Sequence, residues 1–463
     1  MFRRVKKVHF VGIGGIGMSG IAELLLNLGF DISGSDITES PIIEKLIRLG
    51  ADVHMGHSVI NLTDADVLVY SSAVQKDNPE IQAAYEKNIP VIRRAEMLGE
   101  LIAVKETSIG VGGTHGKTTT SSMIGTVLSE GHLDPTLVVG GLVKTIDSNS
   151  KLGAGNIIVV EADEFDRSFL ALRPTISIIT NIELEHIDCY KDLEDLQQAF
   201  IQFANAAPFY GAVIVCADSP ALLEITPEIK RPVITYGLSA GADIRATNIC
   251  YNETQTVYTL WEHEHENGTI KLNVPGEHNV VNSLAAIALG MEMGLKIDTI
   301  AKGLEAYHGV RRRFEIKGIS NDIMVVDDYA HHPTEVYATL QAAKAGWNRR
   351  IVSVFQPHLF SRTQAFFEDF AEAFKESDVL IVTEVYPARE KPIPGVSGAM
   401  VSNAARKTGH GYDVHYVPSL DDMAERLDNI VQPGDMVLTI GAGTIWRYSD
   451  SYFEHLKTLE AAA

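Results

Sequence analysis

A glycine-rich segment ending in Gly-Lys-Thr constrains the fold of this chain more than any other feature. A strand-like run at 108–111 precedes the segment, which covers 112–119, and residues 119–128 continue with apolar side chains at helical spacing. A strand, a glycine-rich turn and a helix in this order are typical of a phosphate-binding loop in a parallel α/β sheet. Val111 stands where the strict pattern has its first glycine, so the alternative is a tight turn without a ligand.

The residue types of this segment suit a nucleotide triphosphate. Glycines let backbone N–H groups approach phosphate oxygens, a lysine ammonium reaches the outer phosphates, and a threonine hydroxyl is a ligand for Mg²⁺. We therefore predict that the chain binds ATP with Mg²⁺. The predicted ATP-binding residues of the loop are Gly113, Thr114, His115, Gly116, Lys117, Thr118 and Thr119.

Composition excludes several classes of protein. The net charge of −21 argues against a nucleic-acid or anionic-membrane surface, and no apolar stretch approaches the roughly 18 residues that a membrane span needs. The 3 cysteines never form a C-x-x-C pair, which favours a reducing cytoplasm. We expect a cytoplasmic protein without nucleic-acid or membrane partners, either a monomer or a weak homodimer.

The 463 residues are enough for about three domains. Buried-looking apolar runs alternate with helical segments along the whole chain, except for a polar and apolar alternation at 244–272 that predicts a short antiparallel patch. We predict an α/β fold of three domains. These are a Rossmann-like N-terminal domain (1–98), a central ATPase domain with the phosphate loop (99–309) and a Rossmann-like C-terminal domain (310–463).

The N-terminal segment has a second glycine motif between a strand at 8–11 and a helix at 18–28. Such a G-x-G-x-x-G turn binds a diphosphate at a helix N-terminus, and an acid at the end of the next strand binds a ribose. The motif fits nicotinamide, flavin and nucleotide-sugar ligands equally well, and a purely structural turn is the alternative. The candidate residues are Gly12, Gly14, Gly15, Gly17 and Asp36.

Polar residues follow several other predicted strands. Glu161 ends the run at 157–160, where open α/β sheets bind ligands, and is a candidate Mg²⁺ ligand beside the phosphate loop. His186 follows the run at 176–179 and is either a ligand or a structural residue. A polar cluster at 327–332, after the run at 323–326, predicts a further binding site, and the basic run at 311–313 is either a phosphate clamp or a solvated charge run.

Taken together, these motifs resemble the Mur ligase family over nearly the whole chain. Beyond the two glycine motifs and Glu161, the resemblance rests on four segments. They are Pro275-Gly276-Glu277-His278-Asn279, Arg313-Phe314-Glu315, the run from Asp327 to Glu335, and the run from Phe355 to Thr363.

The resemblance implies an ATP-dependent ligase that joins L-alanine to the lactyl carboxylate of UDP-N-acetylmuramate. The first glycine motif would hold the UDP diphosphate, Lys117 would bind ATP phosphates, and Thr118, Glu161 and His186 would serve Mg²⁺ sites. The residues implied for catalysis are Lys117, Glu161 and His186. His278 and Asn279 would face the adenine, and Arg313 and Asp327 would meet the phosphate and ribose region of ATP. The residues implied for the L-alanine site are Tyr329, His331, His358 and Arg362.

Three alternatives remain from the sequence. The family's recycling ligases join a murein tripeptide to the same UDP-sugar, but tend to have phenylalanine where Tyr329 stands. Some relatives carry a second arginine where this chain has Leu359, so Arg362 alone would bind the alanine carboxylate. A nicotinamide oxidoreductase would leave Lys117 and Glu161 unexplained, and a nucleotide-gated binding protein would not need the complete lysine, threonine and glutamate set.

Overall fold

The computed structural model describes residues 5–71, 73–185, 189–388, 390–421 and 423–462. It contains three sheets and divides into two compact units. The first comprises Met1–Asn248, Tyr258–Lys271 and Val280–His308, and the second Ile249–Val257, Leu272–Asn279 and Gly309–Ala463. No helix among the described residues is long and apolar enough to cross a membrane.

The N-terminal sheet has five strands in the order β3-β2-β1-β4-β5, and neighbouring strands pair in parallel. Alternate strands and helices form because apolar runs such as that of β1, whose Val8 and Phe10 are fully buried, need cover on both faces. The elements are β1 (Lys7–Val11), α1 (Ile16–Asn27), β2 (Asp31–Asp36), α2 (Pro41–Arg48), β3 (Asp52–Met55), η1 (Val59–Asn61), β4 (Val67–Tyr70), α3 (Pro79–Glu86), β5 (Val91–Arg93) and α4 (Arg94–Ile102).

The central sheet has ten strands in the order β15-β14-β13-β12-β11-β10-β6-β9-β7-β8. The strands from β12 to β7 pair in parallel, and β8 forms an antiparallel edge. The elements are β6 (Thr107–Gly112), α5 (Lys117–Glu130), β7 (Thr136–Val143), β8 (Ser148–Lys151), β9 (Ile157–Glu161), η2 (Phe165–Ala171), β10 (Ile176–Ile179), α6 (Leu193–Asn205), β11 (Ala212–Cys216), α7 (Pro220–Ile225), η3 (Thr226–Glu228), β12 (Val233–Gly237), β13 (Ile244–Asn252), β14 (Gln255–Glu262), β15 (His265–Leu272), α8 (Glu277–Glu292) and α9 (Ile297–Glu305).

The strands β13, β14 and β15 lie at the predicted antiparallel patch. They are neighbours in the sheet and are joined by two-residue connections, which only antiparallel strands can have.

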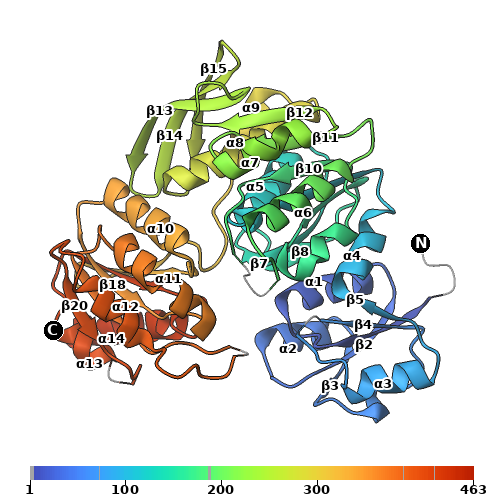
Figure 1. The fold of residues 1–463 in the computed structure, drawn as a ribbon, viewed down its shortest axis with the longest axis horizontal. Helices are drawn as coiled ribbons and strands as arrows, with labels where there is room; N and C mark the ends of the chain where they lie inside the picture. Colours follow the sequence, from blue (N-terminus) through green and yellow to red (C-terminus); the bar gives the residue numbers. More distant parts are fainter. Residues whose placement is uncertain (1–4, 72, 186–188, 389, 422, 463) are drawn as a thin grey trace. The chain divides into compact units, whose positions relative to one another are not determined.

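The C-terminal sheet has six strands in the order β16-β17-β21-β18-β19-β20, of which only the pairing of β16 is antiparallel. The predicted class, a three-domain α/β protein with mostly parallel sheets, is confirmed (Figure 1). The elements are β16 (Glu315–Ser320), β17 (Ile323–Asp328), α10 (Pro333–Gly346), β18 (Arg350–Phe355), α11 (Phe360–Ala373), β19 (Val379–Val382), α12 (Gly398–Ala405), β20 (Asp413–Tyr416), α13 (Met423–Asp428), β21 (Asp435–Ile440) and α14 (Trp446–Ala462).

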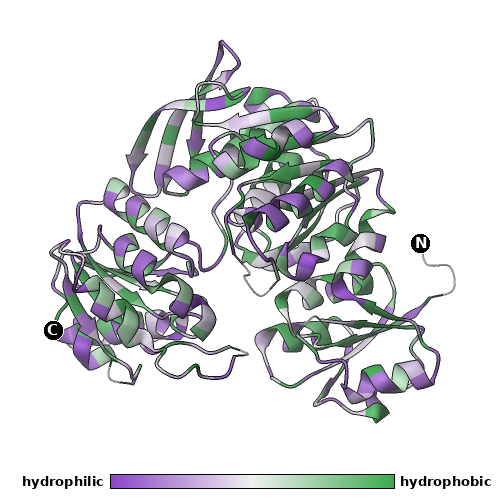
Figure 2. Cartoon of the chain, viewed as in Figure 1, coloured by the Kyte–Doolittle hydropathy of each residue, from purple (hydrophilic) through white to green (hydrophobic). Residues whose placement is uncertain are grey.

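The hydropathy of the residues differs between the strands and the helices. Inner strands such as β9, β11 and β19 are largely hydrophobic, β13, β14 and β15 mix hydrophilic and hydrophobic residues, and many helices carry hydrophilic residues on part of their surface (Figure 2). In the C-terminal sheet, β17 and β21 are buried along their entire length. Burial of both faces places the charged groups of these domains at strand ends, where loops meet solvent.

Candidate functional site

The phosphate loop is built between β6 and α5 as the sequence predicts. Its two glycines with positive φ, Gly113 (φ 127°) and Gly116 (φ 83°), turn the chain into the helix. A Cβ atom at Gly113 would lie 2.1 Å from Thr180 Oγ1, and one at Gly116 would lie 2.5 Å from Asn282 Oδ1. Space and backbone conformation therefore both require glycine at these two positions.

The segment after β10 forms hydrogen bonds with the phosphate loop. Asn181 accepts a hydrogen bond from His115 N at 2.9 Å, and its carbonyl accepts one from Thr114 N at 3.1 Å. The Thr114 hydroxyl is 2.9 Å from Glu183 N, which donates to it. Sequence reasoning did not identify Asn181 or Glu183, and their place after a buried strand was the available signal.

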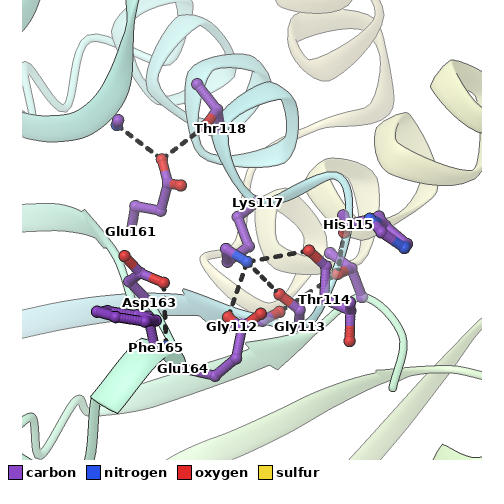
Figure 3. A network of polar contacts seen from close by, with 12 residues as sticks. Gly112, Gly113, Thr114, His115, Lys117, Thr118, Glu161, Asp163, Glu164 and Phe165 are labelled. Atoms are coloured by element: carbon purple, nitrogen blue, oxygen red, sulfur yellow. Dashed lines mark hydrogen bonds and ion pairs between the residues drawn. The ribbon is translucent and has the colours of Figure 1, made fainter. Parts of the chain in front are cut away.

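Lys117 is bound at three points (Figure 3). Its Nζ donates to Gly113 O at 2.6 Å, to Thr114 O at 3.0 Å and to Glu164 Oε2 at 2.7 Å. Burial raises the pKa of Glu164 to about 7 against the opposing effect of Lys117. Burial also opposes the charge of Lys117, but the nearby carboxylates of Glu164, Asp163 and Glu161 outweigh it and raise the pKa of the lysine. The lysine is thus a cation at neutral pH. Glu164 is a partner that the sequence analysis did not assign.

Thr118 and Glu161 lie together, as Figure 3 shows. The Thr118 hydroxyl donates to Glu161 Oε2 at 2.8 Å, and Gly140 N donates to the same oxygen at 2.7 Å. A hydroxyl and a carboxylate at the C-terminal end of a parallel strand, beside a phosphate loop, are an oxygen donor set suited to Mg²⁺. Thr119 occupies the first turn of α5. His186, the third predicted metal ligand, lies outside the described residues.

The first glycine motif lies at the carboxyl end of the N-terminal sheet. Gly14 N donates to Asp36 Oδ2 at 2.8 Å, so the loop and the predicted ribose-binding acid are in direct contact. A Cβ at Gly14 would be 2.9 Å from that oxygen, and one at Gly17 would be 3.1 Å from Arg94 Nη1, whereas Gly15 has more room.

Gly14, Gly15 and Asp36 are among the residues that line a pocket of about 620 Å³ in the N-terminal domain, which is of the size that small-molecule ligands occupy. Gly17 is not among its lining residues. The pocket is lined by Gly12, Gly14, Gly15, Asp36, Ile37, Thr38, Ser40, His57, Ser71, Ala73, Val74, Gln75, Asp77 and Asn78.

In the second unit, an aromatic and cationic cluster contains all four residues that the resemblance implies for the amino acid. The rings of Tyr329 and His331 are 5.3 Å apart, and those of His331 and His358 are 5.9 Å apart. Arg362, which is 8% exposed, places Nη1 3.3 Å from His358 Nδ1. Tyr386 stacks on His358 with ring centroids 5.8 Å apart and was not identified from the sequence.

His278 and Arg313 also lie in the second unit and interact electrostatically. Burial and the nearby Arg313 charge lower the pKa of His278 to about 4, so this imidazole is neutral at physiological pH. The side chain of Asn279 donates to Pro275 O at 2.7 Å. Arg313 lies 3.6 Å from Glu335 and its guanidinium is 5.4 Å from the Tyr329 ring centroid.

Asp327 is fully buried at the end of β17. Arg312 Nε donates to its carboxylate at 3.1 Å, and the Thr439 hydroxyl donates at 2.9 Å. Arg312 is therefore its cationic neighbour. The Arg312 guanidinium also stacks 4.8 Å from the ring centroid of Tyr329, so Asp327 supports the wall of the aromatic cluster.

The three family comparisons agree with this architecture. Residues 7–106 match the Mur ligase family catalytic domain, 111–290 the Mur ligase middle domain and 312–443 the Mur ligase glutamate ligase domain. The chain therefore belongs to the Mur ligase family, whose members are ATP-dependent ligases.

Its relatives include proteins of one named activity. The UDP-N-acetylmuramate–L-alanine ligase of Geotalea uraniireducens is 49% identical over 99% of both chains, and that of Salinibacter ruber is 50% identical over 98% of this chain and 96% of the relative. Among solved structures, the UDP-N-acetylmuramate–alanine ligase of Thermotoga maritima superimposes with a TM-score of 0.84 at 30% identity, covering 98% of this chain and 99% of that one. A murein peptide ligase from Psychrobacter arcticus gives 0.71 at 25% identity, covering 98% of each chain.

Proposed function

We propose that this chain joins L-alanine to the lactyl carboxylate of UDP-N-acetylmuramate with conversion of ATP to ADP and phosphate. The observation that carries the proposal is the identity of 49–50% over essentially the full length to ligases of that name. The phosphate loop and the aromatic and cationic cluster supply the chemistry that this reaction needs.

The reaction requires an activated carboxylate, because a carboxylate and an ammonium do not condense in water. A lactyl carboxylate oxygen would attack the γ-phosphorus of ATP, the bond to the bridging oxygen would break, and ADP would leave. The neutral amine of L-alanine would then attack the acyl phosphate carbonyl, and phosphate would leave as the amine loses a proton. No protein nucleophile is needed, so positioning and charge stabilisation account for catalysis.

Lys117 is the group we assign to the γ-phosphate. Its ammonium is already fixed by two carbonyls and Glu164, and a preorganised donor of this kind contributes roughly 2.7–4 kcal/mol to the stabilisation of developing charge. The backbone N–H groups of 113–119 at the start of α5 would surround the remaining phosphate oxygens. His278, Asn279, Arg313 and the Asp327 region are proposed to meet the rest of ATP.

Thr118 and Glu161 are the residues we propose for Mg²⁺, together with His186. The 2.8 Å between the Thr118 hydroxyl and the Glu161 carboxylate fits two ligands of one small cation. When bound, the ion would supply positive charge that neutralises phosphate oxygens.

The amino-acid site is proposed at Tyr329, His331, His358 and Arg362. The nearly buried Arg362 provides the fixed charge that would bind the alanine carboxylate, and it can do so without a second arginine at Leu359. The UDP portion is assigned to the N-terminal pocket and to Gly17 beside it. Domain limits at 98/99 and 309/310 and a monomeric or weakly dimeric state stay predictions.

Phosphate release from ATP tests the proposal. The purified protein would be given UDP-N-acetylmuramate and Mg²⁺ with either L-alanine or L-Ala-γ-D-Glu-meso-diaminopimelate. Release that depends on L-alanine, with a product one alanyl residue heavier, supports the proposal. Release only with the tripeptide would assign the chain to the recycling reaction of the murein peptide ligases, and release with neither would contradict both.

A further inference from the structure

A buried carboxylate lies beneath the N-terminal pocket. Glu80, at the start of α3, is fully buried, and four groups lie within hydrogen-bond distance of its two oxygens. Oε1 accepts from Ser58 N at 2.9 Å and from the Asn61 side-chain amide at 2.7 Å. Oε2 accepts from the Ser35 hydroxyl at 2.6 Å and contacts His9 Nε2 at 3.0 Å.

These donors keep Glu80 ionised. A carboxylate that accepts several hydrogen bonds is stabilised in its charged form, and here they lower the pKa of Glu80 to about 2 against the opposing effect of burial. An ionised carboxylate only accepts hydrogen bonds. The single hydroxyl proton of Ser35 is therefore directed to Glu80.

The direction of the Ser35 proton determines which ring nitrogen of His57 is protonated. Its Nδ1 lies 2.9 Å from the Ser35 oxygen, and because the Ser35 proton is used on Glu80, that oxygen can only accept. His57 must donate from Nδ1, and in the neutral imidazole its Nε2 then carries a lone pair. His57 lines the 620 Å³ pocket together with the glycine loop and Asp36.

We propose that His57 accepts a hydrogen bond through Nε2 from the nucleoside of the UDP-substrate, and that Glu80 and Ser35 are positioning residues that set its tautomer. This inference rests on the proposed function, since it takes the pocket to be the UDP site. Uridine offers two kinds of donor to such an acceptor, the uracil N3–H and the ribose hydroxyls. Cytosine has no N3–H, which makes the two kinds distinguishable.

Calorimetric titration of the full chain with UDP, CDP, 2′-deoxy-UDP and 3′-deoxy-UDP tests the contact. We expect His57→Ala to weaken UDP binding about tenfold, the worth of roughly one hydrogen bond. If the donor is N3–H, CDP affinity is unchanged by the substitution while both deoxynucleotides are weakened. If it is a ribose hydroxyl, only the nucleotide lacking that hydroxyl is unaffected. Equal weakening of all four nucleotides, or of none, overturns the proposal.

The tautomer has its own readout. Nitrogen-15 spectra of the imidazoles at pH 8, with His57 assigned by comparison with His57→Ala, should show a protonated Nδ1 and a bare Nε2. Glu80→Gln introduces an amide donor toward Ser35, so the serine proton can turn to His57 and the tautomer should invert, with weaker UDP binding. If Glu80→Gln does not fold, Ser35→Ala is the second variant. It removes the hydroxyl that links Glu80 to His57.

Thr63→Ala is the control, because the exposed Thr63 hydroxyl donates to Asp64 at 3.1 Å and belongs to neither the Glu80 network nor the pocket lining. It should leave both the spectrum and UDP affinity unchanged. A protonated Nε2 in the unmodified protein overturns the proposal. Failure of the unmodified protein to bind UDP at all would instead count against the proposed function.

Discussion

Lys117 Nζ lies 2.7 Å from Oε2 of Glu164, with the two side chains 13% and 1% exposed. The lysine that we assign to the γ-phosphate is therefore held by a buried carboxyl group and two loop carbonyls. Such an arrangement preorganises the charge, and it also couples the lysine to the stability of the loop.

Replacement of Lys117 by alanine should lower turnover to less than about a tenth of the unmodified rate, because one preorganised donor is worth roughly 2.7–4 kcal/mol. The measurement is substrate-dependent phosphate release, with thermal unfolding recorded in parallel, since Glu164 loses its partner. Lys151→Ala, at a partly exposed lysine beside Asp134, is the control and should keep its activity. A folded Lys117→Ala protein with more than a tenth of the rate would contradict the assignment.

Glu161→Gln should raise the Mg²⁺ concentration needed for half-maximal activity by at least about tenfold, because an amide oxygen lacks the charge of a carboxylate. Activity would be measured as a function of Mg²⁺ at saturating ATP. Glu228→Gln, in the short helix η3 of the central domain that also contains Glu161, provides a control. An unchanged Mg²⁺ dependence would remove Glu161 from the metal site.

Gly116→Ala should weaken ATP binding by at least about tenfold and destabilise the fold by about 1–2 kcal/mol, since the residue has φ 83° and its new Cβ would meet Asn282. Nucleotide affinity and thermal unfolding together measure both effects. At Gly241 a Cβ meets no atom within 4 Å, so Gly241→Ala should be neutral. Normal ATP affinity in Gly116→Ala would show that the loop tolerates the side chain.

Arg362→Lys should raise the KM for L-alanine about tenfold or more and leave ATP affinity unchanged. Lysine keeps the charge but loses the planar donors that bind a carboxylate at two points and reach His358. Steady-state kinetics with varied L-alanine give the answer, with Arg406→Lys, at the exposed residue that follows α12, as the control. An unchanged KM would place the alanine carboxylate elsewhere.

Glu80 should make the stability of the N-terminal domain depend on acid pH. Its pKa is lowered from 4.5 to about 2 in the folded state, so its contribution is present above pH 4.5 and is lost as the pH falls toward 2. The loss amounts to about 3 kcal/mol. Denaturant unfolding of the unmodified chain and of Glu80→Gln between pH 6 and pH 2.5 should show a smaller pH dependence in the variant. Parallel curves would contradict this linkage.

Much of the fold followed from local pattern. Largely apolar runs such as Ile176–Ile179 predicted buried parallel strands, and β10 has these bounds. Helix limits moved by a few residues, since the helix after the phosphate loop begins at Lys117, where the amide groups of the loop already turn into the first helical turn.

The candidate site also has a part that local sequence predicted and a part that it did not. The sequence by itself determined the residues whose chemistry depends on immediate neighbours, above all Lys117 in its glycine loop and Glu161 at its strand end. Partners supplied from distant positions needed the tertiary structure, because sequence separation carries no signal of contact. Only the tertiary structure decided four such contacts, because burial forces each polar group to find a hydrogen-bond partner. They are Glu164 with Lys117, Arg312 with Asp327, Tyr386 with His358, and the chain of hydrogen bonds from Glu80 through Ser35 to His57.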